Sequence, residues 1–252
     1  MDYRGLSILV TGGAGFIGSH LVDKLMEFGC GVTVLDNLSS GRLENVARWK
    51  GNPNFIFAKR DLLVAVDHRR LLKGRDAVFH FAANPEVRVG LVRSRVHLEQ
   101  NVVATFNLLE SMRRHDGPKI LVFASTSTVY GDATVLPTPE DYAPLEPISV
   151  YGASKLACEA LISSYCHSYG LRAVILRLAN IVGSRSRHGV IYDFILKLKK
   201  NRKTLEILGD GKQAKSYLTV GDCVAAALVA FEKSTSKVSI YNVLAYICKF
   251  HL

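Results

Sequence analysis

Short apolar runs alternate with longer amphipathic stretches along the whole chain. The short runs are mostly unbroken by polar residues, which is typical of strands that are covered on both faces of a parallel sheet. They predict seven strands, over residues 7–11, 31–35, 54–58, 77–81, 119–125, 173–178 and 239–243.

The amphipathic stretches between these runs have the apolar spacing of helices. Residues 132–149 contain four prolines and several acidic residues, so we expect a loop there. Regular alternation of strand and helix, with right-handed crossovers, predicts an α/β fold with a doubly wound parallel sheet. The predicted helices cover residues 16–28, 43–49, 91–114, 150–169, 190–200 and 220–232.

Three glycines stand where the first strand gives way to the first helix. Gly12, Gly15 and Gly18 follow the spacing G-x-x-G-x-x-G. Gly12 allows a tight turn, Gly15 lets a diphosphate approach the backbone, and Gly18 lets the helix pack against the strand. Because free N–H groups at a helix N-terminus attract anions, this turn predicts a dinucleotide site of the Rossmann type. The alternative is a glycine-rich turn without a ligand.

Acidic residues after the second and third strands bear on which dinucleotide binds. Asp36 ends the second strand, where a carboxylate accepts hydrogen bonds from the adenosine ribose and repels a 2′-phosphate. This position favours NAD over NADP, and Arg42 is the residue that could reverse the preference. Asp61 follows the third strand, where it could contact the adenine amine or merely cap a helix, and both interpretations stay open.

A second pattern lies much further along the chain. Tyr151 and Lys155 are four residues apart and share one face of the predicted helix 150–169. A phenol is a poor base at neutral pH, and a nearby ammonium is expected to lower its pKa. Thr126 ends the fifth strand, so its hydroxyl could bridge Tyr151 and a substrate oxygen. The pattern predicts oxidation of an alcohol with a nicotinamide cofactor, and the alternative is an ordinary surface tyrosine and lysine.

Length and composition narrow the remaining classes. The 252 residues suit one α/β domain with a small appendage. No apolar run is long enough to span a membrane, and there is no signal-peptide pattern, so we expect a cytoplasmic protein without a membrane partner. The five scattered cysteines predict reduced thiols and no metal site.

The net charge of +10 raises the question of a nucleic-acid partner. Much of this charge is local, because Arg185, Arg187 and His188 precede the predicted helix 190–200 and several lysines lie along it. We interpret the cluster as a mostly solvated face and expect no nucleic-acid binding, since the base-stacking aromatic pattern of an RNA-binding sheet is missing. Basic residues near a cleft would also suit a ligand with two phosphates.

These motifs together resemble the extended short-chain dehydrogenase/reductases, and within them the UDP-galactose (UDP-glucose) 4-epimerases. The resemblance covers roughly residues 6–243. It is carried by residues 11–18, 36–42, 60–62, 80–83, 101–110, 125–131, 151–155, 177–183 and 208–211.

The resemblance implies NAD as cofactor, a UDP-sugar as substrate, and a role for each matching residue. Thr126, Tyr151 and Lys155 would be catalytic, and Asn101 and Lys155 would position the nicotinamide. Substrate contacts would come from Pro85, Thr126, Asn180, Val190 and Lys215. NAD would be bound by Gly12, Gly15, Phe16, Ile17, Asp36, Asn37, Ser39, Ser40, Gly41, Asp61, Leu62, Phe81, Ala82, Ala83, Asn101, Ser125, Tyr151 and Lys155.

The implied reaction inverts one carbon of the sugar. Tyr151 would take the proton of the 4-hydroxyl while the C4 hydride passes to NAD, and both would return to the opposite face of a transient 4-keto sugar. Relatives that eliminate water carry an Asp-Glu pair after the threonine, and relatives that decarboxylate carry a Glu before Val-Tyr-Gly. Ser127 and Thr128 stand in these places here, which favours an epimerase.

The end of the chain departs from the family pattern, since relatives continue well past the last predicted strand. We expect an NAD-binding domain of residues 1–180 plus 219–243, a small and incomplete substrate lobe of residues 181–218, and an atypical tail of residues 244–252. The alternatives are a catalytically weak, truncated homologue that binds the cofactor, or an epimerase for an N-acetylated or uronic sugar. By resemblance, helices 91–114 and 150–169 would pair with their copies in a homodimer.

Overall fold

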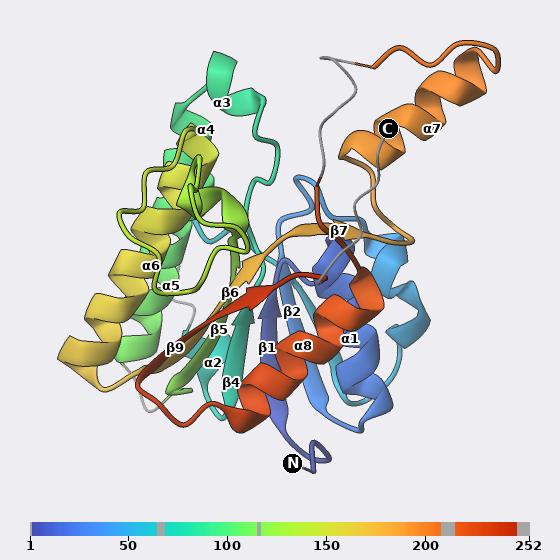
Figure 1. Cartoon of the computed structure of the whole chain (residues 1–252). Helices are drawn as coiled ribbons and strands as arrows, with labels where there is room; N and C mark the ends of the chain where they lie inside the picture. Colours follow the sequence, from blue (N-terminus) through green and yellow to red (C-terminus); the bar gives the residue numbers. More distant parts are fainter. Residues whose placement is uncertain (1, 65–68, 115–116, 208–214, 246–252) are drawn as a thin grey trace.

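A sheet of seven parallel strands forms the centre of the molecule (Figure 1). The computed structural model describes residues 2–64, 69–114, 117–207 and 215–245. The strand order is β3-β2-β1-β4-β5-β6-β9, which confirms the predicted doubly wound fold. The strands are β1 (Ser7–Thr11), β2 (Gly31–Asp36), β3 (Phe55–Lys59), β4 (Ala77–His80), β5 (Ile120–Thr126), β6 (Arg172–Leu178) and β9 (Val238–Val243), each within one residue of its predicted ends.

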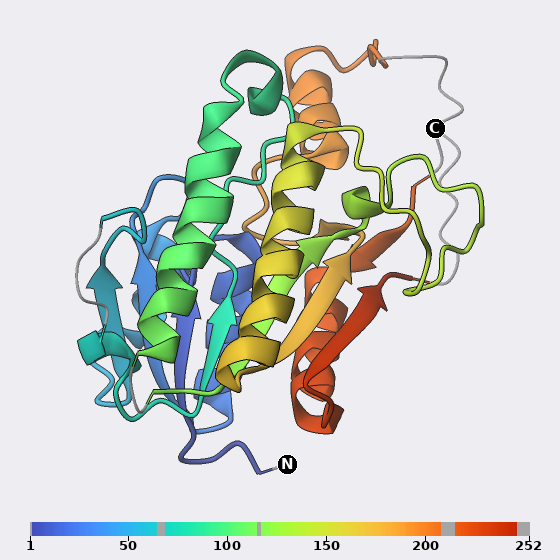
Figure 2. The same cartoon turned by 90° about the vertical axis from the view of Figure 1, so that its left-hand side faces the viewer.

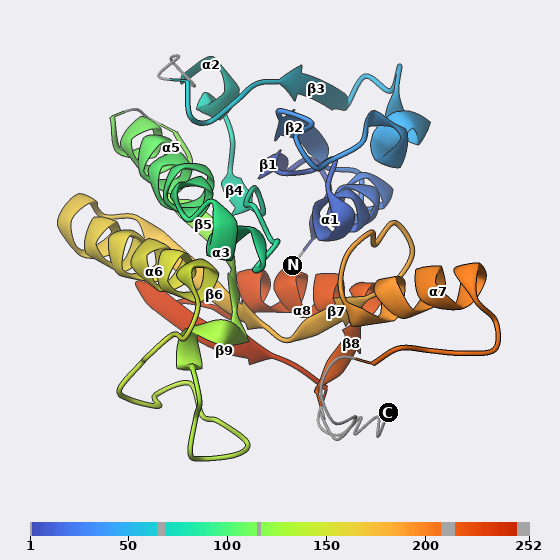
Figure 3. The ribbon, with the colours of Figure 1, turned by 90° about the horizontal axis from the view of Figure 1, so that it is seen from above.

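Helices cover both faces of this sheet (Figure 3). Helices α1 (Phe16–Glu27) and α8 (Val220–Lys233) pack on one face, and α2 (Arg69–Leu72), α5 (Ala104–Arg113) and α6 (Val150–Tyr169) lie on the other. The strand β1 serves both layers, because Ile8 and Val10 belong to one core and Leu9 to the other. Two buried faces explain why the strand sequences are apolar without alternation. None of the described helices is long and apolar enough to cross a membrane.

The predicted helix 91–114 is wrong in its first half. The chain forms the short helices α3 (Val89–Val92) and α4 (Arg95–His97), then a π-helical turn over Leu98–Val103, and only then α5. The turn places Asn101 inward. Its side-chain oxygen accepts a hydrogen bond from the backbone N–H of Asn84, and its side-chain nitrogen donates to the hydroxyl of Ser154, both at 2.8 Å. Likewise, the predicted helix 43–49 is a 3₁₀ helix (Leu43–Trp49).

A small second sheet was not predicted. Strands β7 (Asn180–Val182) and β8 (Tyr217–Thr219) pair in parallel, and three residues each are too short to give a periodic signal. Helix α7 (Val190–Lys200) has its predicted bounds, contains no buried residue and projects away from the layered body (Figure 1). The motif at residues 208–211 and tail residues 246–252 lie outside the described residues.

Candidate active site

The site lies at the carboxyl end of β1, where the strand order of the sheet reverses. Strand β1 has β2 on one side and β4 on the other, with Thr11 paired to Leu35 and to His80. In an open parallel sheet, the carboxyl ends of strands at such a switch point border a crevice. A cleft of about 830 Å³ occupies this position, and the segments that follow β1, β2, β3, β4, β5 and β6 contribute to its wall.

The glycine turn is shaped by contacts with the segment after β4. Gly12 has φ of +69°, and a Cβ there would lie 2.6 Å from the backbone nitrogen of Ala82. A Cβ on Gly18 would collide with the carbonyl oxygen of Gly12. Gly18 therefore lets α1 pack against the glycine turn, whereas the sequence predicted packing against the strand. Gly15 precedes the first residue of α1 and provides no side-chain cap. The first N–H groups of the helix are therefore available to an anion.

Asp36 is held rigidly at the end of β2. It is buried, and its carboxylate accepts from the backbone N–H of Ala14 at 3.0 Å and of Leu38 at 2.8 Å. Burial raises the pKa of Asp36, and the two backbone hydrogen bonds oppose that rise. Gly41 packs directly against this carboxylate, with 3.0 Å between a built Cβ and either oxygen, and does not line the cleft itself.

Asp61 fixes a local turn and lies at the cleft, while its contact with the adenine amine stays a prediction. One carboxylate oxygen accepts from the backbone N–H of Leu63 at 2.8 Å, which fixes a turn, and the other accepts from the side-chain amide of Asn37 at 3.0 Å. Both Asp61 and Asn37 line the cleft. Arg42 also lines it, with an exposed side chain and its backbone N–H bonded to the carbonyl of Ala14.

The tyrosine and lysine enter the same cleft from α6, beside the end of β5. Ser149 caps α6 by accepting from the N–H of Gly152, and this fixes the first turn, which carries Tyr151. The Tyr151 ring lies edge-on to His97, with 5.6 Å between ring centroids. Its hydroxyl is hydrogen-bonded to Thr126, and both residues line the cleft.

The pKa of Tyr151 differs from the expectation. Burial raises it to about 12, and the hydrogen bond from Thr126 offsets only part of this effect. The expected lowering by Lys155 does not contribute to the pKa of Tyr151. The Lys155 ammonium lies over the ring of Phe123, 4.1 Å from its centroid. Burial also lowers the pKa of Lys155, to about 8. The two groups thus form a buried acid–base pair whose charged forms are both disfavoured.

Twenty of the predicted site residues line this one cleft. Three do not: Gly41, Asn101, which is buried behind the wall, and Lys215, which is exposed elsewhere. The lining residues are Gly12, Gly15, Phe16, Ile17, Asp36, Asn37, Ser39, Ser40, Asp61, Leu62, Phe81, Ala82, Ala83, Pro85, Ser125, Thr126, Tyr151, Lys155, Asn180 and Val190.

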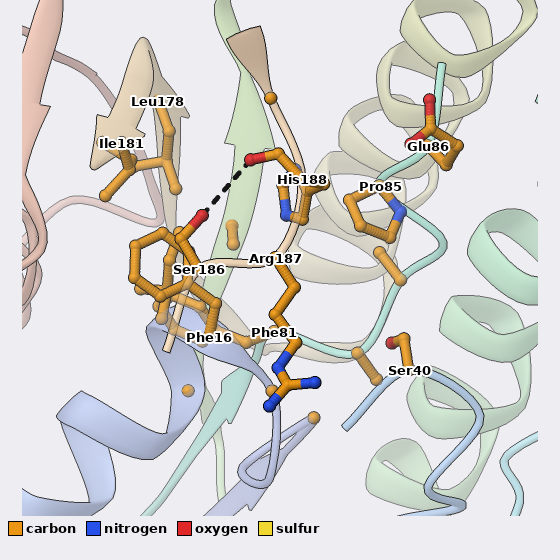
Figure 4. A pocket seen from close by; sticks show the side chains of 18 of the residues that line it. Phe16, Ser40, Phe81, Pro85, Glu86, Leu178, Ile181, Ser186, Arg187 and His188 are labelled. Carbon is orange, nitrogen blue, oxygen red and sulfur yellow. Dashed lines mark hydrogen bonds between the residues drawn. The ribbon is translucent and has the colours of Figure 1, made fainter. Parts of the chain in front are cut away.

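Other lining residues were not predicted as site residues. The basic residues of this group come from four segments: Arg42 follows β2, Arg60 follows β3, Arg88 follows β4, and Arg185, Arg187 and His188 lie between β7 and α7. Figure 4 shows Arg187 and His188 of the last segment. The sequence shows the charge cluster around residue 187, but it does not show that these side chains face the cleft. The principal members are Gln100, Arg88, Thr128, Ser186, Arg187, His188 and Tyr192.

Fold, glycine turn, Asp36 and the tyrosine–lysine pair define a dinucleotide-dependent enzyme of the doubly wound class. The NAD dependent epimerase/dehydratase family matches residues 8–243, and the chain belongs to this family. It is an enzyme related to the UDP-glucose 4-epimerases, its cofactor is NAD, and the cradle at Gly12 and the carboxylate of Asp36 fit that cofactor.

Three relatives show how close the match is. A putative UDP-glucose 4-epimerase of Methanocaldococcus jannaschii is 40% identical over 238 residues, which are 92% of this chain and 76% of the relative. The crystal structure of a UDP-galactose 4-epimerase is 51% identical, with a TM-score of 0.84 over 95% of this chain and 77% of the other. A UDP-glucuronic acid 4-epimerase from Bacillus cereus, in complex with UDP-glucuronic acid and NAD, is 31% identical, with a TM-score of 0.88 over 96% and 78%.

Proposed function

We propose that the protein interconverts UDP-galactose and UDP-glucose by epimerisation at C4. The observation that carries this proposal is the convergence of Thr126, Tyr151 and Lys155 on the cleft that also holds the glycine turn and Asp36. A proton-transfer group therefore faces the cavity in which NAD binds. This is the arrangement needed for reversible oxidation of a hydroxyl.

Bound NAD supplies the hydride acceptor for C4 and returns the same hydride. The protein supplies the proton transfer: Tyr151 removes the proton of the 4-hydroxyl, and Thr126 hydrogen-bonds the phenol. With pKa values of about 12 and 8, Tyr151 and Lys155 together hold two protons at neutral pH. The pair becomes a base when it loses one proton and the ammonium of Lys155 stabilises the phenolate.

The remainder of the cleft is proposed to hold the sugar nucleotide. Asn180 and Val190 line it on the side of β7 and α7, and Pro85 lines it from the segment after β4. The position of Val190 supports residues 181–218 as the substrate lobe and residues 1–180 plus 219–243 as the NAD-binding part. Neither Ser127 nor Thr128 can act as the acid or base that dehydration or decarboxylation needs at neutral pH. An N-acetylated or uronic sugar is the second candidate, favoured by the likeness to the UDP-glucuronic acid 4-epimerase.

The test is turnover by the purified protein without added oxidant or reductant. UDP-galactose should give UDP-glucose with no net accumulation of reduced nicotinamide. In one sample, chromatography measures the sugar nucleotides and absorbance measures the reduced nicotinamide. Tyr151→Phe should lower the turnover rate by a factor of about 10²–10⁴ while NAD stays bound. Tyr192→Phe removes another cleft phenol and serves as the matched control.

Other substrates decide between the candidates. Conversion of the N-acetylated or uronic sugar, without conversion of UDP-galactose, would replace the proposed substrate but keep the reaction. Bound NAD with no conversion of any of the three sugars would refute the proposed activity.

A further inference from the structure

The segment between β7 and α7 brings a free guanidinium over the dinucleotide cleft. From its geometry, we propose that Arg187 closes over the diphosphate of the bound dinucleotide and slows its release. This inference rests on the NAD site and is independent of which sugar the enzyme converts.

Helix α1 anchors this segment. Arg185 donates to the carboxylate of Asp23 at 2.8 Å and to the hydroxyl of Ser19 at 3.1 Å. One residue earlier, the carbonyl of Ser184 lies 3.0 Å from Nε2 of His20. These contacts come from the same helix whose N-terminus faces the cleft, so the segment is fixed relative to the glycine turn.

The backbone of the segment turns sharply at its anchor. Arg185 has φ of +66°, in the left-handed region that few residues with a side chain adopt. At the next residue, the hydroxyl of Ser186 donates to the carbonyl of His188 at 3.3 Å. The turn directs Arg185 toward α1 and leaves Arg187 on the side of the cleft.

Arg187 extends into the cavity, away from Leu178 and Ile181 and toward the side where Ser40 lies (Figure 4). It makes no hydrogen bond or ion pair with another residue in the part of the chain that the structure describes, and it is exposed to solvent. In contrast, Arg185 is committed to Asp23. Arg187 is therefore the arginine of this segment that is available to a ligand.

The chemistry favours the diphosphate of the dinucleotide as that ligand. The N-terminus of α1, which follows Gly15 and has no side-chain cap, contributes N–H groups and a positive partial charge at one side of the cleft. The planar guanidinium of Arg187, from the segment between β7 and α7, can donate two parallel hydrogen bonds to phosphate oxygens. The anion would then be bound from two elements far apart in the sequence, and release would require the anchored segment to move.

Binding measurements on the full chain, after removal of bound NAD, test the proposal directly. Arg187→Ala should raise the Kd for NADH about tenfold and speed NADH release, measured by fluorescence during a chase with excess NAD. ADP-ribose, which retains the diphosphate, should lose affinity equally, and adenosine, which lacks it, should lose none. Arg187→Lys should fall between wild type and Arg187→Ala, because an ammonium keeps the charge but not the paired donors.

Arg202→Ala is the matched control, because it removes the same charge from an exposed arginine that does not line the cleft. It should leave both NADH affinity and release rate unchanged. Unchanged NADH binding in Arg187→Ala would overturn the proposal, as would an equal loss for adenosine. A loss confined to UDP binding would also overturn it, by placing Arg187 on the other diphosphate. Since no sugar turnover is measured, failure here would leave the proposed reaction untouched.

Discussion

At the scale of single residues, the side chains proposed to be catalytic, Tyr151 and Lys155, lie in surroundings that oppose their charged forms. Lys155 is buried, with its ammonium over Phe123, and its pKa is lowered to about 8. A lowered pKa means that the unfolded chain binds more protons than the folded chain between about pH 8 and the usual lysine value. The stability contributed by this site is therefore lowest below pH 8 and rises as the pH increases through that window.

The variant Lys155→Met should consequently be more stable than the wild type at pH 7, by about 2 kcal/mol, while losing turnover. The gain should shrink as the pH rises from 8 toward 10.5, because wild-type Lys155 becomes neutral in both states. Urea unfolding at several pH values measures this difference. A gain that stays constant with pH would show that the ammonium does not destabilise the fold.

The same pair predicts the pH dependence of the rate. Loss of one proton from Tyr151 and Lys155 generates the base, and the first loss occurs near the lower pKa of about 8. Turnover should rise about tenfold per pH unit below pH 8 and then flatten. In Lys155→Arg the guanidinium keeps its proton, so the rising limb should move to higher pH. A rate that falls between pH 7 and 9 would contradict this assignment.

The sequence predicts individual site residues well where a motif also fixes their direction. Asp36 and Tyr151 follow directly from a strand end and a helix start, so their side chains face the cleft, and the backbone of Gly12 lines it. For Asn101 the motif identifies the residue but not its depth, which the π-helical turn determines. The direction of Arg187 depends on the ion pair between Arg185 and Asp23, which are 162 residues apart, and no local pattern encodes such a contact.

At the scale of elements, a buried ion pair joins α6 to β6. Arg177 and Glu159 are both buried, with 2.8 Å between Nη2 and Oε2, and Glu159 also accepts a hydrogen bond from Ser125. Arg177 additionally donates to the hydroxyl of Tyr130 at 2.9 Å and to the carbonyl of Glu140 at 3.0 Å. The pair thus connects the sheet, the catalytic helix and the loop 132–149.

Breaking this pair on one side should be costly, because it leaves a buried charge without its partner. Arg177→Met should lower the free energy of unfolding by about 3–5 kcal/mol, whereas the double variant Glu159→Leu with Arg177→Met should recover much of that loss. The exposed pair Arg95 and Glu99 provides the control, since Arg95→Met should leave the free energy of unfolding nearly unchanged. Additive losses in the double variant, measured by urea unfolding, would argue against coupling of the two charges.

The elements differ in how far the sequence could predict them. Seven strands with two buried faces give long apolar signals, and α6 is predicted with its bounds intact. The prediction of a continuous helix before α5 is wrong because the tertiary contacts of Asn101 override the helical spacing. Strands β7 and β8 exist because they pair with each other across the chain, which a window along one segment does not reveal.

At the scale of the whole molecule, the face covered by α5 and α6 exposes apolar side chains. Leu98, Val103 and Phe106 are 55%, 38% and 43% exposed on the π-helical turn and on α5. Helices α5 and α6 lie side by side as the outer layer on this face (Figure 2). The resemblance to the 4-epimerases gave these helices as a homodimer contact. We therefore propose that a second copy of the chain covers this face.

A single charge at the centre of that face should separate the copies. Phe106→Glu places a carboxylate in an apolar contact, where it would be desolvated without a partner, so dimers should dissociate to monomers. Light scattering coupled to size-exclusion chromatography reports the mass directly. Val229→Glu makes the same change at a valine that is 55% exposed on α8, on the opposite face, and should leave the dimer intact. A wild-type protein that remains monomeric at high concentration would refute the proposed dimer. A dimer broken only by Val229→Glu would place the interface on the opposite face.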